Sequence, residues 1–323
     1  MLAELKAAER RHGQVLKVVR ALIGAILNPA YADLLRPDSL DLIGTPEGER
    51  VVSELTSLLE AGARAGHVRV CDYGAAARVV LGLALWSPIV PPTPLSGAER
   101  RRIIEGLQEL VTYGCVGDRA ERLRDRRPDA GSFWCAEAGG RDTILASASY
   151  VLNRRPAVSM AEIAAALEVS ADTLRLCFGE RDRLVAACHM RSHTIFLQIQ
   201  DAAILPGPLT AVSVRSLVRE TALSYLRRNL QPLGPLVGLG ELDAASEAQI
   251  RLRWAGLGML LRTRWIDGVG AGELRERHHQ LAPRFWPALC SALACGLWQE
   301  EPQDPRLVAD SVAEMICVGL API

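Results

Sequence analysis

The sequence predicts an all-helical protein, and three observations lead to this fold class. Stretches rich in Ala, Leu, Val, Arg and Glu dominate, while aromatic residues make up only 5% of the chain, a composition that favours helices over strands. Apolar residues recur three and four positions apart, which is the spacing of one helix face. No segment alternates apolar and polar residues with comparable strength, so no strand is expected.

Four helices are expected in the first third of the chain. The first covers 2–28, and the second covers 48–65 and ends at a pair of glycines. The segment 72–86 is apolar almost throughout, which predicts a buried helix that stops before a cluster of prolines. Ser96 and Glu99 then form a capping box that opens the fourth helix.

The remainder divides at a segment that breaks the helical pattern. Residues 117–140 contain Gly, Pro and five closely spaced arginines, and this composition predicts a linker. A group of short helices follows at 141–190. Long helices are expected after it, at 213–229, 242–266, 281–298 and 304–320.

The two regions of long helices contain a weak internal repeat. LTSLLEAG at 55–62 matches LCSALACG at 289–296, with Leu, Ser, Leu and Gly in the same register. An aspartate begins the next apolar helix in both copies, at Asp72 and Asp304. The linker lies between the two copies, so the sequence predicts a tandem arrangement.

Charge, targeting and cysteine content exclude several classes of protein. The 37 Lys and Arg residues balance the 37 Asp and Glu residues, which excludes a generally basic coat for nucleic acid. The charged start of the chain lacks the apolar centre of a signal peptide, and no apolar run is long enough to span a membrane. The eight cysteines form no CxxC pair, and we expect reduced thiols in a cytoplasmic protein.

Residues 159–178 predict a helix-turn-helix. Ser159 and Glu162 form a second capping box, and Ser170 is a natural N-cap for the next helix after a connection of three residues. Two short helices joined in this way fit a DNA-binding motif whose second helix enters the major groove. The expected core residues are Ile163, Leu167, Val169, Leu174 and Phe178.

This segment resembles the DNA-binding domain of the tetracycline-repressor (TetR) family of transcriptional regulators. The run from 159 to 184 matches the family pattern without a gap, at Ile163-Ala164, Val169-Ser170, Thr173-Leu174, Phe178, Asp182 and Leu184. It departs from the pattern at the turn glycine, which is Glu168, and at the recognition-helix Tyr and His, which are Arg175 and Cys177. The family's Ser-Lys pair is Glu180-Arg181.

The resemblance extends more loosely to the long helices, which are similar to the family's ligand-binding and dimerisation domain. It implies a helix-turn-helix domain between two helical TetR-type C-terminal domains. The implied domains are 1–116, a linker at 117–140, the DNA-binding domain at 141–190 and a second C-terminal-like domain at 191–323. Residues 1–13 are too short for a helix-turn-helix, so either the first copy has lost its own or the start lies too late.

The resemblance also implies a function and its site. We expect a transcriptional regulator that binds operator DNA and responds to a small apolar effector, with no cofactor and no metal. Arg175 and Arg181 are expected to hold phosphates. The DNA-binding residues are expected to be Ser159, Met160, Ser170, Ala171, Asp172, Thr173, Arg175, Cys177 and Arg181.

Several alternatives remain open at this level. Residues 141–190 contain six arginines and six acidic residues, so the chain could instead be a ligand-sensing or protein-interaction module that no longer binds DNA. His189 and His193 have a metal-compatible spacing but are expected to be packing or surface residues. No nucleophile or acid-base constellation favours an enzyme. Apolar pocket or core positions are expected at Trp254, Met259, Trp265, Trp286 and Trp298.

The tandem arrangement also predicts how the halves assemble. TetR-type domains dimerise through their last two long helices, and this chain holds two such domains. We expect 72–115 to pair with 281–320 inside one molecule. The competing outcome is a homodimer that brings two copies of 141–190 together.

Overall fold

The chain is all-helical wherever the structure describes it. The computed structural model shows no strand in these residues, and the only extended pairing there is an isolated bridge between Val116 and Leu274. The predicted fold class is confirmed at this level. The described residues are 15–27, 46–87, 96–116, 140–204, 209–276, 281–294 and 304–321.

The four helices expected in the first third are present. They are α2 (Val15–Ile26), α3 (Pro46–Arg64), α4 (Tyr73–Trp86) and α5 (Gly97–Tyr113). Asp72 caps α4, because its side chain accepts a hydrogen bond from the Ala75 N–H at 2.9 Å. The capping box of Ser96 and Glu99 opens α5 as predicted. The start of the first expected helix and the linker at 117–139 lie outside the described residues.

The rest of the described chain forms eight α-helices and a short 3₁₀ helix. They are α6 (Gly140–Arg154), α7 (Met160–Ala166), α8 (Ala171–Phe178), α9 (Arg181–Ala203), α10 (Ala211–Leu226), η4 (Leu239–Glu241), α11 (Ala244–Gly270), α12 (Ala282–Ala294) and α13 (Pro305–Val318). The predicted domain boundary at 190 falls inside α9. This helix is continuous because it packs on α6 and α8 as well as on α10 and α11.

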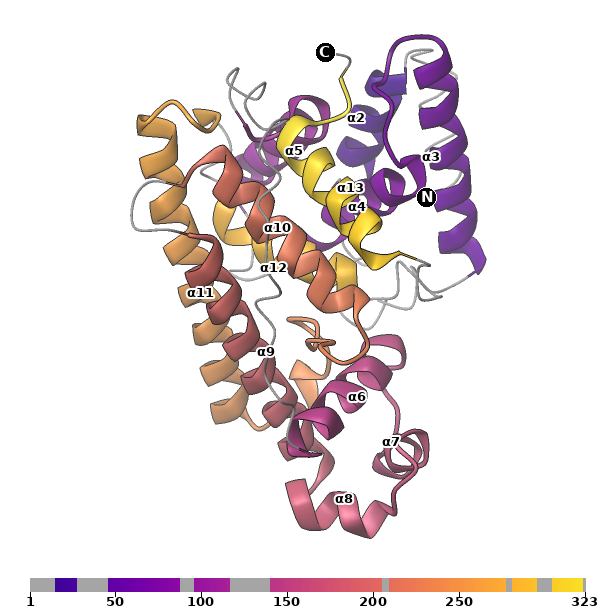
Figure 1. Cartoon of the computed structure of the whole chain (residues 1–323), viewed down its shortest axis with the longest axis vertical. Helices are drawn as coiled ribbons and strands as arrows, with labels where there is room; N and C mark the ends of the chain where they lie inside the picture. The colour runs from indigo at the N-terminus through magenta and orange to yellow at the C-terminus, as the bar shows by residue number, and fades with distance from the viewer. Residues whose placement is uncertain are drawn as a thin grey trace.

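One hydrophobic core joins the two halves of the chain. Helix α4 is buried on almost every side and packs against α3, α12 and α13, as its uniformly apolar sequence requires. Trp86 of α4 and Trp286 of α12 are among the largest fully buried side chains of the described residues. Figure 1 shows the early helices α2–α5 beside the C-terminal helix α13, with α6–α8 at the opposite end of the molecule. The contact predicted between 72–115 and 281–320 is therefore present.

The C-terminal ends of α5 and α13 meet in a reciprocal arrangement. Gly114 follows α5 with φ 68°, and Gly319 follows α13 with φ 76°. The two residues after each glycine donate backbone hydrogen bonds to the last turn of the other helix. The four bonds run from Cys115 to Ile316 (2.9 Å), Val116 to Cys317 (3.1 Å), Leu320 to Val111 (2.9 Å) and Ala321 to Thr112 (2.8 Å). When Gly114 is matched to Gly319, the first bond corresponds to the third and the second bond to the fourth. The exchange therefore has local two-fold symmetry.

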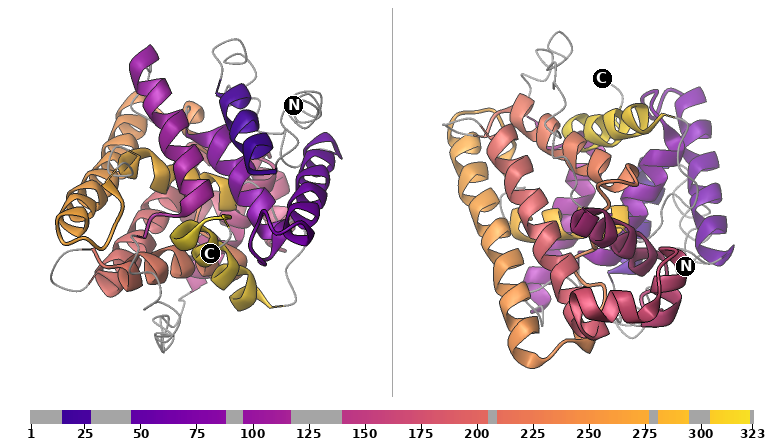
Figure 2. Two further views of the ribbon diagram at one scale, coloured as in Figure 1. Left: turned by 90° about the horizontal axis from the view of Figure 1, so that it is seen from above. Right: turned by 60° about the horizontal axis from the view of Figure 1, so that its bottom comes forward.

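The packing indicates a different repeat register from the one the sequence suggests. The match of 55–62 with 289–296 pairs α3 with α12 and α4 with α13. In the structure, α3 packs on α4 as α11 packs on α12, and α2 packs on α5 as α10 packs on α13. Figure 2 shows these groups from two further directions. The two-fold arrangement therefore relates α2–α5 to α10–α13, and the sequence match is displaced by one helix.

Candidate DNA-binding site

Helix α7 begins at the predicted capping box. The Ser159 hydroxyl accepts from the Glu162 N–H at 3.3 Å, and the Glu162 carboxylate accepts from the Ser159 N–H at 2.9 Å. Hydrogen bonds from Ser159 lower the pKa of Glu162, so this carboxylate is ionised at neutral pH. Met160 was predicted to contact DNA, but its side chain is only 6% exposed. We remove Met160 from the contact set because it packs in the core.

The turn after α7 has the backbone geometry that a glycine normally provides. The Val169 N–H donates to the Ala164 carbonyl at 3.0 Å, and the Glu168 N–H donates to the Ala165 carbonyl at 3.1 Å. These two bonds form a Schellman motif, in which the residue after the helix is left-handed. Glu168 occupies that position with φ 57° and is the one non-glycine residue with positive φ in the described chain.

Helix α8 presents one buried face and one exposed face. Ser170 caps it by accepting from the Thr173 N–H at 3.0 Å. Leu174 and Phe178 are buried, as predicted for the motif core. Ala171 is partly exposed. The exposed side chains are Asp172, Thr173, Arg175, Leu176 and Cys177. Figure 1 places α8, together with α7, at the end of the molecule farthest from α2–α5.

The two arginines expected to hold phosphates have different environments. Arg175 is exposed and makes one ion pair with Asp172 at 3.3 Å. Arg181 instead donates to the carbonyls of Pro156 and Val158 and forms an ion pair with Glu241. Burial lowers the pKa of the Arg181 guanidinium from its usual value. Because these contacts occupy its donors, Arg181 fastens the start of α9, and we keep only Arg175 as a phosphate contact.

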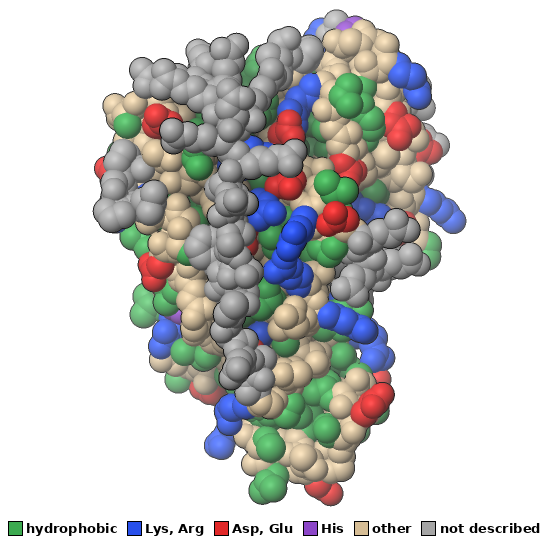
Figure 3. Space-filling model, viewed as in Figure 1, with side chains coloured by type: hydrophobic (Ala, Val, Ile, Leu, Met, Phe, Trp, Pro, Cys, Tyr) green, Lys and Arg blue, Asp and Glu red, His purple; other side chains and the backbone are tan. Residues whose placement is uncertain are grey.

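The charges of this domain neutralise each other locally. Arg155 lies 3.5 Å from the Glu162 carboxylate, and Arg175 is paired with Asp172. On the face seen in Figure 3, basic, acidic and apolar side chains all occur at the lower end of the molecule, without a continuous basic patch. The five arginines of the predicted linker lie outside the described residues. Sequence-independent attraction to phosphates is therefore weak in the described part of the domain.

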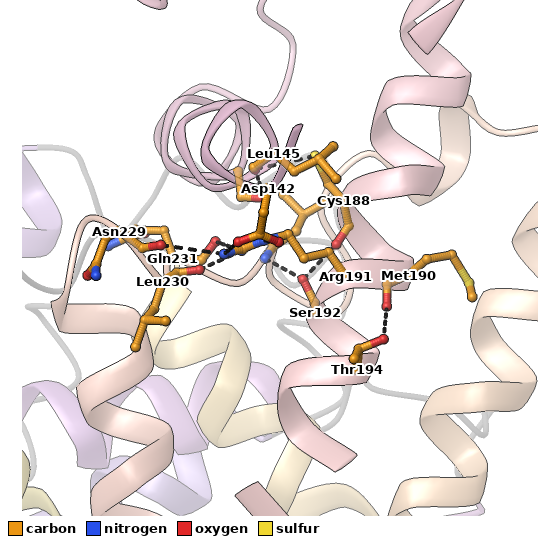
Figure 4. A network of polar contacts seen from close by, with 12 residues as sticks. Asp142, Leu145, Cys188, Met190, Arg191, Ser192, Thr194, Asn229, Leu230 and Gln231 are labelled. Carbon is orange, nitrogen blue, oxygen red and sulfur yellow. Dashed lines mark hydrogen bonds and ion pairs between the residues drawn. The ribbon is translucent and has the colours of Figure 1, made fainter. Parts of the chain in front are cut away.

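An ion pair between a buried arginine and a half-exposed aspartate attaches the domain to the rest of the molecule (Figure 4). Arg191 of α9 binds both carboxylate oxygens of Asp142 on α6, at 2.7 and 3.0 Å. The same guanidinium donates to the carbonyls of Leu230 and Gln231, at 2.5 and 3.4 Å, just after α10. Since only 7% of the Arg191 side chain is exposed, this group fixes α6, α9 and the end of α10 together.

The segment 229–242, which we call the anchor loop, makes further contacts with the same domain. Asn153 of α6 donates to the Pro232 carbonyl and accepts from the Gly234 N–H, both at 2.8 Å. His189 of α9 forms a hydrogen bond with the Val237 carbonyl at 2.9 Å. Every helix-turn-helix movement relative to α10 and α11 must therefore involve the anchor loop.

A cavity of about 770 Å³ lies on the other side of the anchor loop. Its wall includes Pro235, Leu236 and Leu239 from the loop, with further residues from α5, α11 and the start of α12. Trp254 and Met259, for which the sequence left pocket and core positions open, both line it. The size is that of a small-molecule site.

The other described candidate residues lie in the core or are partly buried, and none of them forms a site. Trp265 and Trp286 are core residues that pack edge-on against Phe285 and Phe196. Trp298 lies outside the described residues. His189 is fully buried, which lowers its pKa to about 4, and burial lowers the pKa of His193 as well. The described residues hold no cluster of His, Cys, Asp and Glu side chains suited to a metal ion.

Comparison with known proteins adds no relative. The chain matches no protein-family model, and a search of curated proteins gives no match. Within the described helices, none combines the length and the apolarity needed to cross a membrane.

Proposed function

We propose that the chain is a TetR-like transcriptional regulator that reads DNA with the single helix-turn-helix at 159–178. In this proposal, helices α2–α5 take the place of the second subunit of a dimer. The observation that carries the proposal is the turn between α7 and α8. Glu168 adopts a left-handed conformation where the family pattern has glycine, and α8 is exposed beyond this turn.

The exposed residues of α8 divide into two roles. Asp172 and Thr173 lie in its first turn, the part of a recognition helix that reaches base edges in the major groove. Arg175 lies one turn further on and suits a phosphate oxygen. The described cysteines are all free thiols, which is consistent with the reducing cytoplasm in which such a regulator acts.

The proposal is tested by selecting duplexes from a random library and measuring affinity by fluorescence anisotropy at several salt concentrations. We expect Thr173→Ala to relax the sequence preference at one base pair. Arg175→Ala is expected to weaken binding to all sequences alike and to reduce the slope of log K against log salt by about one. Arg306→Ala, an exposed arginine of α13, is the matched control and should change neither. A library that yields no preferred duplex would refute the regulator.

One observation favours a second function, a ligand-sensing or protein-interaction module without DNA binding. Arg155, Arg175 and Arg181 are each paired with a carboxylate of this chain, and Leu176, which is 88% exposed, lies on the exposed face of α8. Under this alternative, the wild type binds DNA only weakly and without sequence preference. Leu176→Ser would not change that weak DNA binding, but it would abolish binding of a partner protein.

A further inference from the structure

The cavity beside the anchor loop has a mainly apolar body. It lies between α5, the anchor loop, α11 and the start of α12. Most of its wall comes from aliphatic, aromatic and proline side chains, among them Ile103, Leu236, Trp254, Met259 and Leu281. Such a wall accommodates a hydrocarbon or aromatic body.

The charges on the wall are mostly positive. Four arginines line the cavity, Arg102, Arg251, Arg262 and Arg284, against a single carboxylate, Glu99. Hydrogen bonds from Ser96 lower the pKa of Glu99, so this group stays ionised and is held by the start of α5. With all five groups charged, the wall has an excess of three positive charges.

The four arginines are not equivalent. Arg251 is paired with Glu247 at 2.6 Å, and burial lowers the pKa of Arg284, against the opposing effect of Glu99. No ion pair joins Arg102 or Arg262 to a carboxylate in the described part of the chain, although the charge of Arg102 helps to lower the pKa of Glu99. These two guanidinium groups are available to a ligand.

Trp254 lines the cavity, but its indole N–H is shielded from solvent and is therefore out of reach of a bound ligand. The site thus offers an apolar body and two guanidinium groups.

We propose that this cavity binds an amphipathic carboxylate, with an apolar chain or ring system in the cavity and the carboxylate held by Arg102 and Arg262. Guanidinium groups bind carboxylates through paired hydrogen bonds, which a neutral or cationic head group cannot form. The inference deepens the proposed function, because it names the class of effector as anionic and amphipathic where the sequence suggested only an apolar one.

The test is isothermal titration of the full chain, without DNA, with dodecanoate, 2-naphthoate and the neutral 1-dodecanol below their aggregation concentrations. We expect at least one carboxylate to bind, and dodecanoate to bind more than about tenfold tighter than the alcohol. Arg102→Gln and Arg262→Gln should each weaken carboxylate binding about tenfold, whereas Arg306→Gln, away from the cavity, should have no effect.

Three outcomes would overturn the inference. They are equal affinity for the acid and the alcohol, wild-type affinity in both arginine variants, and no binding of either carboxylate. Met259→Trp fills the cavity without removing a charge, so binding retained by this variant would place the ligand elsewhere. Since DNA is absent from these titrations, a chain that binds dodecanoate but no duplex would refute the regulator and leave this site standing.

Discussion

Gly319 packs directly against Gly114, backbone to backbone, where α13 and α5 end. A Cβ atom on Gly319 would lie 2.5 Å from the Thr112 carbonyl oxygen, and a Cβ atom on Gly114 would overlap the carbonyl of Cys317. Both residues have positive φ, which other residues adopt only with strain. The two halves of the chain are thus joined at a point where only glycine fits on either side.

Gly319→Ala is therefore expected to destabilise the protein strongly. Gly66→Ala is the matched control, because Gly66 also has positive φ but no atom lies within 4 Å of its would-be Cβ. The control should cost about 1 kcal/mol of unfolding free energy from backbone strain alone. Gly319→Ala should cost at least about 2 kcal/mol more, because the backbones must separate. Equal losses in urea denaturation would contradict this reading of the junction.

The internal pairing predicts a monomer. Helices α4 and α5 pack against α12 and α13 within one chain, so these faces are already buried. Light scattering at micromolar concentration should give the mass of one chain, 35.0 kDa. Twice that mass would instead support the homodimer and two reading heads in one particle.

Glu168→Gly is expected to stabilise the protein. The left-handed conformation costs a residue with a Cβ atom about 1 kcal/mol or more, and glycine avoids most of that strain. The gain should be about 0.5–1 kcal/mol in the midpoint analysis of urea unfolding. Glu162→Gly, inside α7, serves as the opposite control and should destabilise. A loss of stability in Glu168→Gly would mean that the carboxylate makes a contact that outweighs the strain.

Removing the carboxylate partner of the buried Arg191 should loosen the helix-turn-helix domain. Asp142→Ala leaves the Arg191 guanidinium buried with carbonyl acceptors only, and we expect a loss of about 1–3 kcal/mol, because solvent already screens the half-exposed carboxylate. Asp172→Ala removes an equivalent charge from the exposed pair with Arg175 and should change stability by less than about 0.5 kcal/mol. Similar losses in the two variants would contradict the anchoring role of Arg191.

The stability of the protein should fall between pH 6.5 and pH 4 because of His189. Its folded pKa of about 4 lies below the usual 6.5, so in this window the unfolded chain binds a proton that the folded chain excludes. The full effect is about 3 kcal/mol, present at neutral pH and lost as the pH falls. His189→Gln should flatten the stability profile between pH 5 and 6.5, where most carboxylates stay ionised. A wild-type slope in that variant would exclude His189 as the titrating group.

Local sequence signals predicted the helices well. Asp72, Ser96, Ser159 and Ser170 each cap the helix expected after them, since an N-cap depends on contacts within a few residues. The repeat register failed for the opposite reason. Short Ala- and Leu-rich segments match easily, whereas the two-fold relation depends on backbone bonds between segments about two hundred residues apart.

The candidate site was predictable only in part. The exposed face of α8 follows from the positions of Leu174 and Phe178, which fix the buried side of a short helix. The occupation of Arg181 by Glu241 and by two carbonyls was not predictable, because its partners come from distant segments. Arg191 gave one signal that could have been used, since it stands at a core-facing position of α9 and therefore required an acidic partner.

At the junction of Gly114 and Gly319, the two halves associate when the chain folds, so no separate binding step is needed. A homodimer dissociates on dilution, whereas two halves in one chain remain associated at any protein concentration. In a homodimer, every substitution appears on both sides of the interface. In this chain a substitution appears on one side only, so each half can change independently of the other. The two halves of a single molecule can thus diverge in sequence without losing their association.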